Sequence, residues 1–373
     1  MIAPERLYYA LREAGISFFA GVPDSVLRGF CSCVESLCDS GEHVGCPNEG
    51  SAISLATGYH LATNRIAVVY MQNSGLGNAV NPLTSLTHPD VYRIPALLIV
   101  GWRGEPGTKD EPQHMVQGGI TTSLLDLLSV PYEILGGDSD VDQVVRTVLK
   151  KIGSSGGPAA LLVRSDALGA YPGGQEPQGL SRLVREDAVR QILHLSDPED
   201  VFIATTGKIS RELFELRVER KEEQRDFLTV GSMGHASSIA LGVAQARPNR
   251  RVICMDGDGA MLMHMGVMPT IGTSAPRNLI HIILNNGAHE SVGGQPTVAR
   301  QMDLNALARA SGYASYYHCA DASGVAENWD HLTTREGPIL WEIKVAMESR
   351  SNLGRPTSGP QENKEEFKKH VAR

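Results

Sequence analysis

Two polar side chains in the carboxyl-terminal half stand directly after apolar runs and have the chemistry of metal ligands. Asp258 lies in an Asp-Gly-Asp-Gly turn after the run 251–255, and Asn286 follows the run 279–284. The carboxyl ends of adjacent parallel strands meet at one edge of a sheet, where ligands bind. Mg²⁺ prefers carboxylate and amide oxygens together with phosphate oxygens, and glycines let backbone N–H groups approach a phosphate. The spacing predicts a magnesium–diphosphate site, whereas a tight turn is the alternative for an Asp-Gly pair alone.

Glu49 and Asp24 also follow predicted strands, and each has a purely structural interpretation. Glu49 stands where the run 43–46 turns into a helix, and the helix dipole favours any glutamate in such a first turn. The alternative is that Glu49 faces a bound cofactor. Asp24, taken by itself, is well placed to cap the helix that begins at Val26.

A long polar loop follows the apolar run 96–100 and carries Arg103, Lys109 and His114. Long loops at the carboxyl end of a strand are often functional. The charged groups suit an anion with several charges, because guanidinium matches phosphonate and sulfonate oxygens. A solvated loop without a ligand is the alternative. Asn73 lies in a glycine-rich turn after another strand, and its amide could likewise face a substrate.

Apolar runs and helical patterns alternate along the whole chain, and the runs are short and rich in Val and Ile, as in parallel strands covered on both faces. The predicted strands are 18–19, 43–46, 66–70, 96–100, 159–163, 200–204, 227–230, 251–255, 279–284 and 338–344, and a region near 313–318 is left without an assigned type. The predicted helices are 5–14, 26–37, 49–62, 141–151, 185–195, 210–217, 231–246, 305–311 and 324–333. This alternation predicts an α/β fold of two doubly wound parallel-sheet domains, 1–168 and 183–373, joined by a linker at 169–182.

The composition excludes several classes of protein. Hydrophobic residues make up 42% and charged residues 20% of the chain, which is typical of a globular protein, and the net charge of −8 argues against a nucleic-acid surface. No apolar run approaches the length of a membrane span, and the amino terminus lacks a signal-peptide core, so we expect a cytoplasmic protein with no membrane partner. The six cysteines include no CxxC pair. Reduced cysteines are therefore the favoured interpretation, and a zinc or redox site is the alternative.

Segments spread from Gly21 to Thr297 resemble the two-domain, thiamine diphosphate-dependent decarboxylases of the phosphonopyruvate decarboxylase family. The segments are GVPDS, NEGSAISLATGYHLAT, YMQNSGLGNAVNPL, GWRGEPGTKDEPQH, GSMGHASSIALG, DGDGAMLMHMG and NNGAHESVGGQPT. Many thiamine diphosphate decarboxylases carry a third, middle domain, for which this chain has no room. The resemblance implies that both domains have the thiamine diphosphate-binding fold, the first binding the pyrimidine and the second the diphosphate and Mg²⁺.

The resemblance also implies roles for individual residues. Glu49 would hydrogen-bond the aminopyrimidine of thiamine diphosphate, and Met233 would hold the cofactor bent beside the carbonyl of Gly231. Further cofactor contacts would come from Thr206, Asp258, Gly259, Ala260 and Asn286. The implied ligands of Mg²⁺ are Asp258, Asn286 and the backbone carbonyl of Ala288. The implied catalytic residues are Glu49, Asp24 and His114, and the implied substrate-binding residues are Ser25, Asn73, Arg103, Lys109 and His289.

The implied reaction is the decarboxylation of 3-phosphonopyruvate, a small 2-keto acid, to phosphonoacetaldehyde and CO₂ through the ylid and enamine of the cofactor, in phosphonate biosynthesis. Family members bind the cofactor between subunits, so Glu49 and Asp258 would meet across an interface of a homo-oligomer that is at least a dimer. Three alternatives stay open. They are a sulfopyruvate decarboxylase, a carboligase, which the missing middle domain disfavours, and a cofactor-binding but non-catalytic regulatory subunit.

Overall fold

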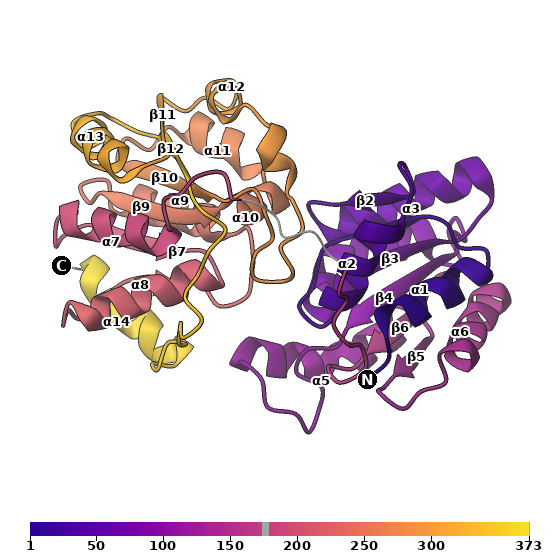
Figure 1. The fold of residues 1–373 in the computed structure, drawn as a ribbon. Helices are drawn as coiled ribbons and strands as arrows, with labels where there is room; N and C mark the ends of the chain where they lie inside the picture. Colours follow the sequence, from indigo (N-terminus) through magenta and orange to yellow (C-terminus); the bar gives the residue numbers. More distant parts are fainter. Residues whose placement is uncertain (174–178, 373) are drawn as a thin grey trace. The chain divides into compact units, whose positions relative to one another are not determined.

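The computed structural model of the chain describes residues 1–173 and 179–372, which form two units (Figure 1). One unit comprises Met1–Glu176 with Ser291–Gln295, and the other comprises Pro177–Glu290 with Pro296–Arg373. The middle of the predicted linker, residues 174–178, lies outside the described residues. Each unit is built on its own six-stranded sheet.

The sheet of the first unit is parallel throughout, with the strand order β2-β1-β3-β4-β6-β5. Its strands are β1 (Phe19–Gly21), β2 (His43–Gly45), β3 (Ala67–Gln72), β4 (Ala96–Gly101), β5 (Tyr132–Leu135) and β6 (Ala159–Val163). Every residue of β4 and β6 is buried, which explains their unbroken apolar sequences. The chain leaves β1 for β2 on one side and continues to β3 on the other, and the carboxyl ends of strands at such a reversal are where open α/β sheets bind ligands.

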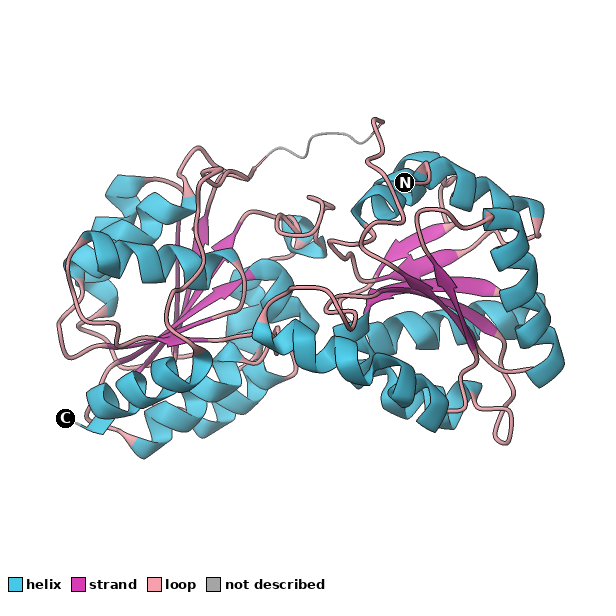
Figure 2. Cartoon of the chain, turned by 90° about the horizontal axis from the view of Figure 1, so that it is seen from below, coloured by secondary structure: helices cyan, strands magenta, loops and turns pink. Residues whose placement is uncertain are grey.

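Helices cover both faces of this sheet (Figure 2). On one face pack α1 (Pro4–Glu13), α2 (Arg28–Leu37) and α6 (Val141–Ser155), and on the other pack α3 (Glu49–Thr63), α4 (Leu76–Pro82) and α5 (Pro112–Leu127). Helix α3 begins at Glu49 because the Asn48 side chain accepts a hydrogen bond of 2.9 Å from the N–H of Ser51. Helix α3 ends at Asn64, which has a left-handed backbone with φ 56°.

The sheet of the second unit is also parallel, with the strand order β11-β12-β10-β9-β7-β8. Its strands are β7 (Val201–Ala204), β8 (Phe227–Leu228), β9 (Val252–Gly257), β10 (Leu279–Asn285), β11 (Ser315–Cys319) and β12 (Ile339–Lys344). On one face pack α7 (Arg185–Leu195), α8 (Lys208–Glu219) and α13 (Ala322–Leu332). On the other face pack α9 (Ala236–Ala246), α10 (Asp258–Met263), α11 (Val267–Ser274), α12 (Leu304–Ala310) and α14 (Pro360–Ala372).

The predicted α/β class and its two parallel sheets are confirmed. The sequence patterns did not predict seven elements, namely α4, α5, β5, α10, α11, β11 and α14. The predicted start of the helix 231–246 was wrong, because α9 begins only at Ala236. The preceding Gly231, Ser232 and Gly234 have φ values of 65°, 44° and 86°, which a right-handed helix does not allow.

No helix in the described ranges is both long enough and apolar enough to cross a membrane. All six cysteines are free thiols, and five of them are buried. Burial raises the pKa of Cys46 and Cys319 to about 11, so these thiols stay protonated and behave as small apolar side chains.

Candidate active site

Asp24 lies at the carboxyl end of β1 and is completely buried. Its Oδ2 accepts hydrogen bonds from the N–H groups of Val26 (2.9 Å) and Leu27 (3.1 Å), and its Oδ1 accepts one of 2.6 Å from Gln72. Burial raises the pKa of Asp24, and these hydrogen bonds oppose the rise. A Cβ at Gly101 would lie 2.1 Å from Oδ2, so only glycine fits there. The carboxylate holds the turn before α2, but it is not the cap of that helix as predicted, because α2 begins only at Arg28, after Leu27.

Glu49 occupies the first turn of α3 and is 4% exposed. Its Oε2 accepts a hydrogen bond of 2.8 Å from Nδ2 of Asn78 on α4. Burial raises the pKa of Glu49, and the bond from Asn78 opposes the rise. A Cβ at Gly75 would lie 2.3 Å from Oε1, so a glycine after β3 makes room for the carboxyl group. The result is a buried acid with a tendency to hold its proton.

The loop after β4 is organised around Asp110. Its carboxylate accepts two hydrogen bonds from the Arg103 guanidinium, at 2.6 and 2.5 Å, and lies 3.1 Å from Nδ1 of His114. Burial alone would raise the pKa of Asp110, but the bonds from Arg103 and His114 lower it to about 2. Burial lowers the pKa of His114, although Asp110 opposes the shift. Arg103 also donates a bond of 2.9 Å to Ser25 Oγ, which brings three predicted site residues together.

The two other predicted substrate residues of this unit, Asn73 and Lys109, differ in their exposure to solvent. Asn73 is 4% exposed, and its Nδ2 donates to the carbonyl of Arg103 and to Thr121 Oγ1, both at 2.9 Å. Its Oδ1 accepts the N–H of Arg103 at 3.2 Å. The amide thus ties the β4 loop to α5, and its hydrogen-bonding groups are engaged within the chain. Lys109 is exposed at the tip of the loop.

In the second unit, Asp258 begins α10 at the carboxyl end of β9 and is 2% exposed. Burial raises its pKa to about 6, and hydrogen bonds from Thr297 and from nearby backbone N–H groups, including that of Asn286, oppose the rise. Thr297 Oγ1 donates a short hydrogen bond to Asp258 Oδ2. Among the described residues, no basic side chain forms an ion pair with this carboxylate.

Asn286 and Ala288 form the turn after β10 and are also buried. The Oδ1 of Asn286 accepts the N–H of Ala288 at 3.0 Å, and its Nδ2 donates to Glu290 Oε2 at 3.0 Å. The backbone N–H of Asn286 reaches the Asp258 carboxylate. The structure thus brings the predicted ligands Asp258 and Asn286 together from adjacent strands.

The turn after β8 presents Met233 between Gly231 and Gly234, both with left-handed φ values. The N–H of Gly231 donates 3.1 Å to Thr206 Oγ1, which joins this turn to the one after β7. In the same region Thr205 has a buried Oγ1 with no hydrogen-bond partner among the described residues.

Gly259 and Ala260 lie in the first turn of α10 and are buried. A Cβ at Gly259 would lie 3.0 Å from the His289 ring and 3.5 Å from Met233 Cε, so these two side chains converge on the glycine. Burial lowers the pKa of His289 to about 4, which leaves the imidazole neutral. The second unit thus gathers its predicted cofactor residues at one edge of its sheet.

One group of potential metal ligands lies within the second unit, formed by Cys254, Asp256 and His281 on β9 and β10. Their ligand atoms lie within 4.8 Å of one another and all three side chains are buried. His281 Nε2 lies 3.5 Å from Asp256 Oδ2, and its Nδ1 lies 2.9 Å from Tyr313 Oη. The group is most simply described as a buried histidine–aspartate pair inside the sheet.

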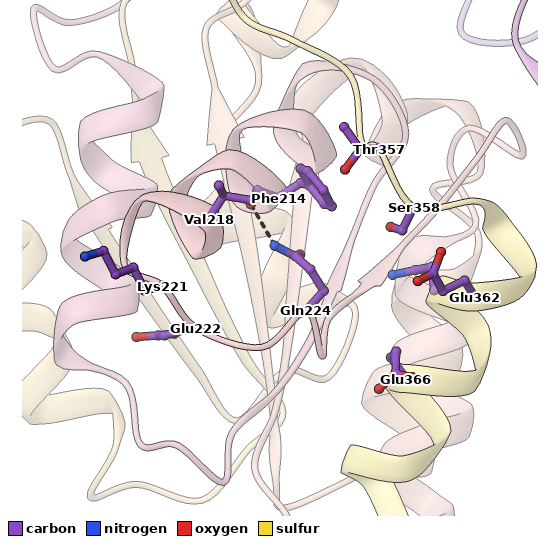
Figure 3. A pocket seen from close by; sticks show the side chains of 10 residues that line it. Phe214, Val218, Lys221, Glu222, Gln224, Thr357, Ser358, Glu362 and Glu366 are labelled. Carbon is purple, nitrogen blue, oxygen red and sulfur yellow. Dashed lines mark hydrogen bonds between the residues drawn. The ribbon is translucent and has the colours of Figure 1, made fainter.

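A surface hollow of about 450 Å³ lies between the end of α8 and the start of α14 (Figure 3). Phe214, Lys221, Gln224 and Glu362 are among its lining residues. Gln224 Nε2 donates a hydrogen bond of 3.1 Å to the carbonyl of Phe214, which helps to hold the wall. No predicted site residue lines this hollow, so it is separate from the candidate site.

Comparison with known proteins agrees with this geometry. Residues 1–125 match the family model of the N-terminal thiamine pyrophosphate-binding domain of thiamine pyrophosphate enzymes, and residues 206–343 match that of the C-terminal domain. A phosphonopyruvate decarboxylase of Streptomyces viridochromogenes is 34% identical over 387 residues, covering 100% of this chain and 95% of the relative. The chain belongs to the phosphonopyruvate decarboxylase family of thiamine pyrophosphate enzymes. The predicted family, fold and cofactor, thiamine diphosphate, are therefore confirmed.

Two further relatives refine the position within the thiamine pyrophosphate enzymes. A phosphonopyruvate decarboxylase of Streptomyces hygroscopicus is 34% identical over 384 residues, covering 99% of this chain and 94% of the relative. A sulfopyruvate decarboxylase of Methanosarcina acetivorans is 27% identical over 345 residues, covering 87% of this chain and 86% of the relative. The chain is thus a thiamine diphosphate-dependent decarboxylase that is less similar to this sulfopyruvate enzyme than to the two phosphonopyruvate enzymes.

Five residues without a predicted role of their own contact predicted site residues, namely Gln72, Asn78, Asp110, Glu290 and Thr297, and all five lie within the segments that carry the family resemblance. Gln72, Asn78 and Thr297 contact predicted site residues that lie 29 to 48 residues away along the chain, whereas Asp110 and Glu290 contact ones four to seven residues away. A polar residue close to a predicted functional one is too frequent in loops to be assigned a role by itself.

Proposed function

We propose that this chain converts 3-phosphonopyruvate to phosphonoacetaldehyde and CO₂ in the cytoplasm, with thiamine diphosphate and Mg²⁺, as a step of phosphonate biosynthesis. The observation that carries this proposal is the full-length similarity to two phosphonopyruvate decarboxylases, compared with the lower identity to the sulfopyruvate enzyme. Arg103 and Lys109 on the loop after β4 would supply positive charge for a substrate with a multiply charged anionic group, with Arg103 held in place by its ion pair with Asp110.

The chemistry of the second unit fits Mg²⁺. A buried carboxylate without a cationic partner is unfavourable, and the raised pKa of Asp258 reflects this cost. A divalent cation beside Asp258 would offset the cost of burying this negative charge. We propose that Asp258, Asn286 and the carbonyl of Ala288 bind Mg²⁺, since hard oxygen atoms are the ligands that this ion takes.

The residues present also fit the organic cofactor. The unpartnered Thr205 hydroxyl and the neighbouring Thr206 could donate to a diphosphate, and Gly259 leaves space beside Met233. When bound, thiamine diphosphate supplies the nucleophilic carbon and the electron sink for the loss of CO₂. Glu49, buried and inclined to stay protonated, would share its proton with the pyrimidine ring.

The substrate would be held by the first unit and by His289. We propose that Arg103 and Lys109 bind the phosphonate and that Ser25 and Asn73 help to shape the surrounding loop, since Arg103 bonds both. His114 and Asp24 are the proposed sources of the proton that replaces CO₂. His114 suits this role better, because both oxygens of Asp24 already accept hydrogen bonds within the chain.

We further propose that the active enzyme is a homo-oligomer, at least a dimer, with the active site at the subunit interface. The 16-residue helix α5 supports this proposal. Val116, Ile120 and Leu127 are 67%, 52% and 81% exposed, and their spacing of four and seven residues puts them on one side of the helix. Such an apolar stripe favours contact with another protein surface, which we assign to a second copy of the chain.

Replacing Val116 and Ile120 together by lysine is expected to weaken self-association by more than about 100-fold, because two charges would have to leave water. Sedimentation velocity over a range of protein concentrations measures this effect. Tyr92→Lys is the matched control, since Tyr92 is 68% exposed but precedes the amino end of β4. A double variant that assembles like the wild type would contradict the assignment of α5.

The proposed substrate is tested by kcat/KM for phosphonopyruvate, sulfopyruvate and pyruvate, measured side by side with thiamine diphosphate and Mg²⁺. Phosphonopyruvate is expected to be preferred over sulfopyruvate by at least about tenfold, a difference of about 1.4 kcal/mol that one additional charge can supply. Equal values for all three acids would refute the phosphonate assignment, and a preference for sulfopyruvate would favour the second candidate function. No turnover of any acid by cofactor-loaded protein would favour a non-catalytic subunit.

A further inference from the structure

The side-chain amide of Asn286 is fixed in one orientation by a carboxylate that sequence analysis did not assign. Glu290 Oε2 lies 3.0 Å from Asn286 Nδ2. A carboxylate can only accept hydrogen bonds, so the NH₂ group of the amide must face Glu290. The amide oxygen therefore points to the other side, where it accepts the N–H of Ala288, itself part of the proposed metal site.

Glu290 is held in turn by two basic side chains. Arg185 Nη1 lies 2.5 Å from Oε2, and Lys208 Nζ lies 2.9 Å from Oε1. Each carboxylate oxygen of Glu290 thus has a basic partner, and a carboxylate in two ion pairs offers only acceptor atoms to Asn286. Arg185 begins α7 and Lys208 begins α8, so two helices anchor the carboxylate.

The same network extends to a second carboxylate that does not touch Asn286. Glu212 accepts bonds of 2.9 and 2.6 Å from Arg185 and is completely buried. Arg185 and Lys208 bring two basic groups to the two acidic groups Glu212 and Glu290, so the formal charges of this network balance. Glu212 and Glu290 thus share a partner, but only one of them orients the amide.

We propose that Glu290 is a positioning residue that presents the Oδ1 atom of Asn286 to the divalent cation, with Arg185 and Lys208 holding Glu290 in place. This inference rests on the proposed Mg²⁺ site at Asp258 and Asn286. Without Glu290 only the N–H of Ala288 opposes a turn of the amide that would bring its NH₂ group, which repels a cation, toward the metal. Loss of a residue that orients a metal ligand typically lowers metal affinity by about 10–100-fold.

The test measures metal binding directly. Free Mn²⁺, which replaces Mg²⁺, is counted by its electron paramagnetic resonance signal during titration of the full chain at constant thiamine diphosphate, without substrate. Glu290→Ala is expected to weaken Mn²⁺ binding by about 10–100-fold. Glu290→Gln, whose amide oxygen can still accept from Asn286, is expected to recover part of this loss. Glu212→Gln is the matched control, expected to bind Mn²⁺ within about threefold of the wild type although it lowers the unfolding temperature.

Mn²⁺ binding by a further variant, Asp258→Ala, distinguishes a wrong metal site from a wrong role for Glu290. If Asp258→Ala binds Mn²⁺ as the wild type does, the metal site is misplaced and the role of Glu290 falls with it. If Asp258→Ala loses Mn²⁺ but Glu290→Ala binds normally, the site stands and the positioning role is refuted. Equal losses of affinity in Glu290→Ala and Glu212→Gln would also refute it, because they would reflect general damage to the buried network.

Discussion

Replacing Glu49 by glutamine is expected to lower kcat by about 10²–10⁴-fold, the usual contribution of a group that transfers a proton. A glutamine amide can donate a hydrogen bond but cannot transfer a proton to the pyrimidine, whereas the buried carboxyl group of Glu49 has a raised pKa and can hold and transfer one. The fold should survive, because a glutamine oxygen can still accept the hydrogen bond from Asn78. Steady-state turnover, measured together with cofactor binding, shows whether catalysis alone is lost.

The control for this variant is Glu133→Gln in the same unit. Glu133 pairs with Lys151 at 2.7 Å, far along the chain from every predicted site residue, and its replacement should leave kcat unchanged. Unfolding temperatures of both variants are expected to stay near that of the wild type. A Glu49→Gln enzyme that binds thiamine diphosphate and retains kcat within about threefold would remove the proposed role of Glu49, since proton transfer normally contributes much more.

Replacing Asp258 by asparagine is expected to weaken Mg²⁺-dependent cofactor binding by more than about 100-fold. This loss is larger than the roughly 10–100-fold loss of metal affinity that is usual when a residue that only orients a metal ligand is removed. The variant removes the single negative charge among the proposed protein ligands, and an amide oxygen attracts a divalent cation much less. Calorimetric titration of thiamine diphosphate at fixed Mg²⁺ measures the loss. Unchanged affinity would mean that the cation is bound elsewhere.

Without cofactor, the same substitution is expected to stabilise the protein at neutral pH. Burial raises the pKa of Asp258 from its ordinary value of 3.8 to about 6. The folded protein therefore holds the proton of Asp258 more tightly than the unfolded chain does. The stability that the proton adds to the folded state is fully present below pH 3.8 and is lost as the pH rises through about 6. At pH 7.5 the cost of the ionised carboxylate is roughly 2–3 kcal/mol, which asparagine avoids.

The measurement is the free energy of unfolding of metal-free wild type and Asp258→Asn from pH 4 to pH 8. The advantage of the variant should grow as the pH rises and nearly vanish at pH 4. Mg²⁺ with thiamine diphosphate should reverse the order, because ligands that bind only the folded state stabilise it. A variant less stable than the wild type at pH 7.5 would show that the hydrogen bonds from Thr297 and the backbone N–H groups outweigh the cost of burying the charge.

Residues that directly follow apolar strands could be predicted from the sequence. Asp258 and Asn286 follow β9 and β10, so the parallel order of these strands was enough to bring them together. Glu49 also follows a predicted strand, and this placed it at the start of a helix. The structure shows that Asn48 caps this helix, α3. Register within such apolar runs is strongly determined, since the strands are buried on both faces.

Partners that come from other elements could not be predicted. Glu290 depends on Arg185, which lies 105 residues away along the chain. Helix α5 was also missed, because it contains Gly118 and Gly119 and divides its apolar residues between a buried and an exposed face. Such a helix lacks the one-sided periodicity that identifies helices in a sequence, and its stability depends on packing.

Decarboxylation of phosphonopyruvate by this chain can be followed by ³¹P nuclear magnetic resonance while the CO₂ released is trapped and counted. With thiamine diphosphate and Mg²⁺ present, the phosphonopyruvate signal should be replaced by that of phosphonoacetaldehyde, with one CO₂ released per aldehyde formed. An unchanged phosphonopyruvate signal, or CO₂ release accompanied by a condensation product in place of the aldehyde, would contradict the account.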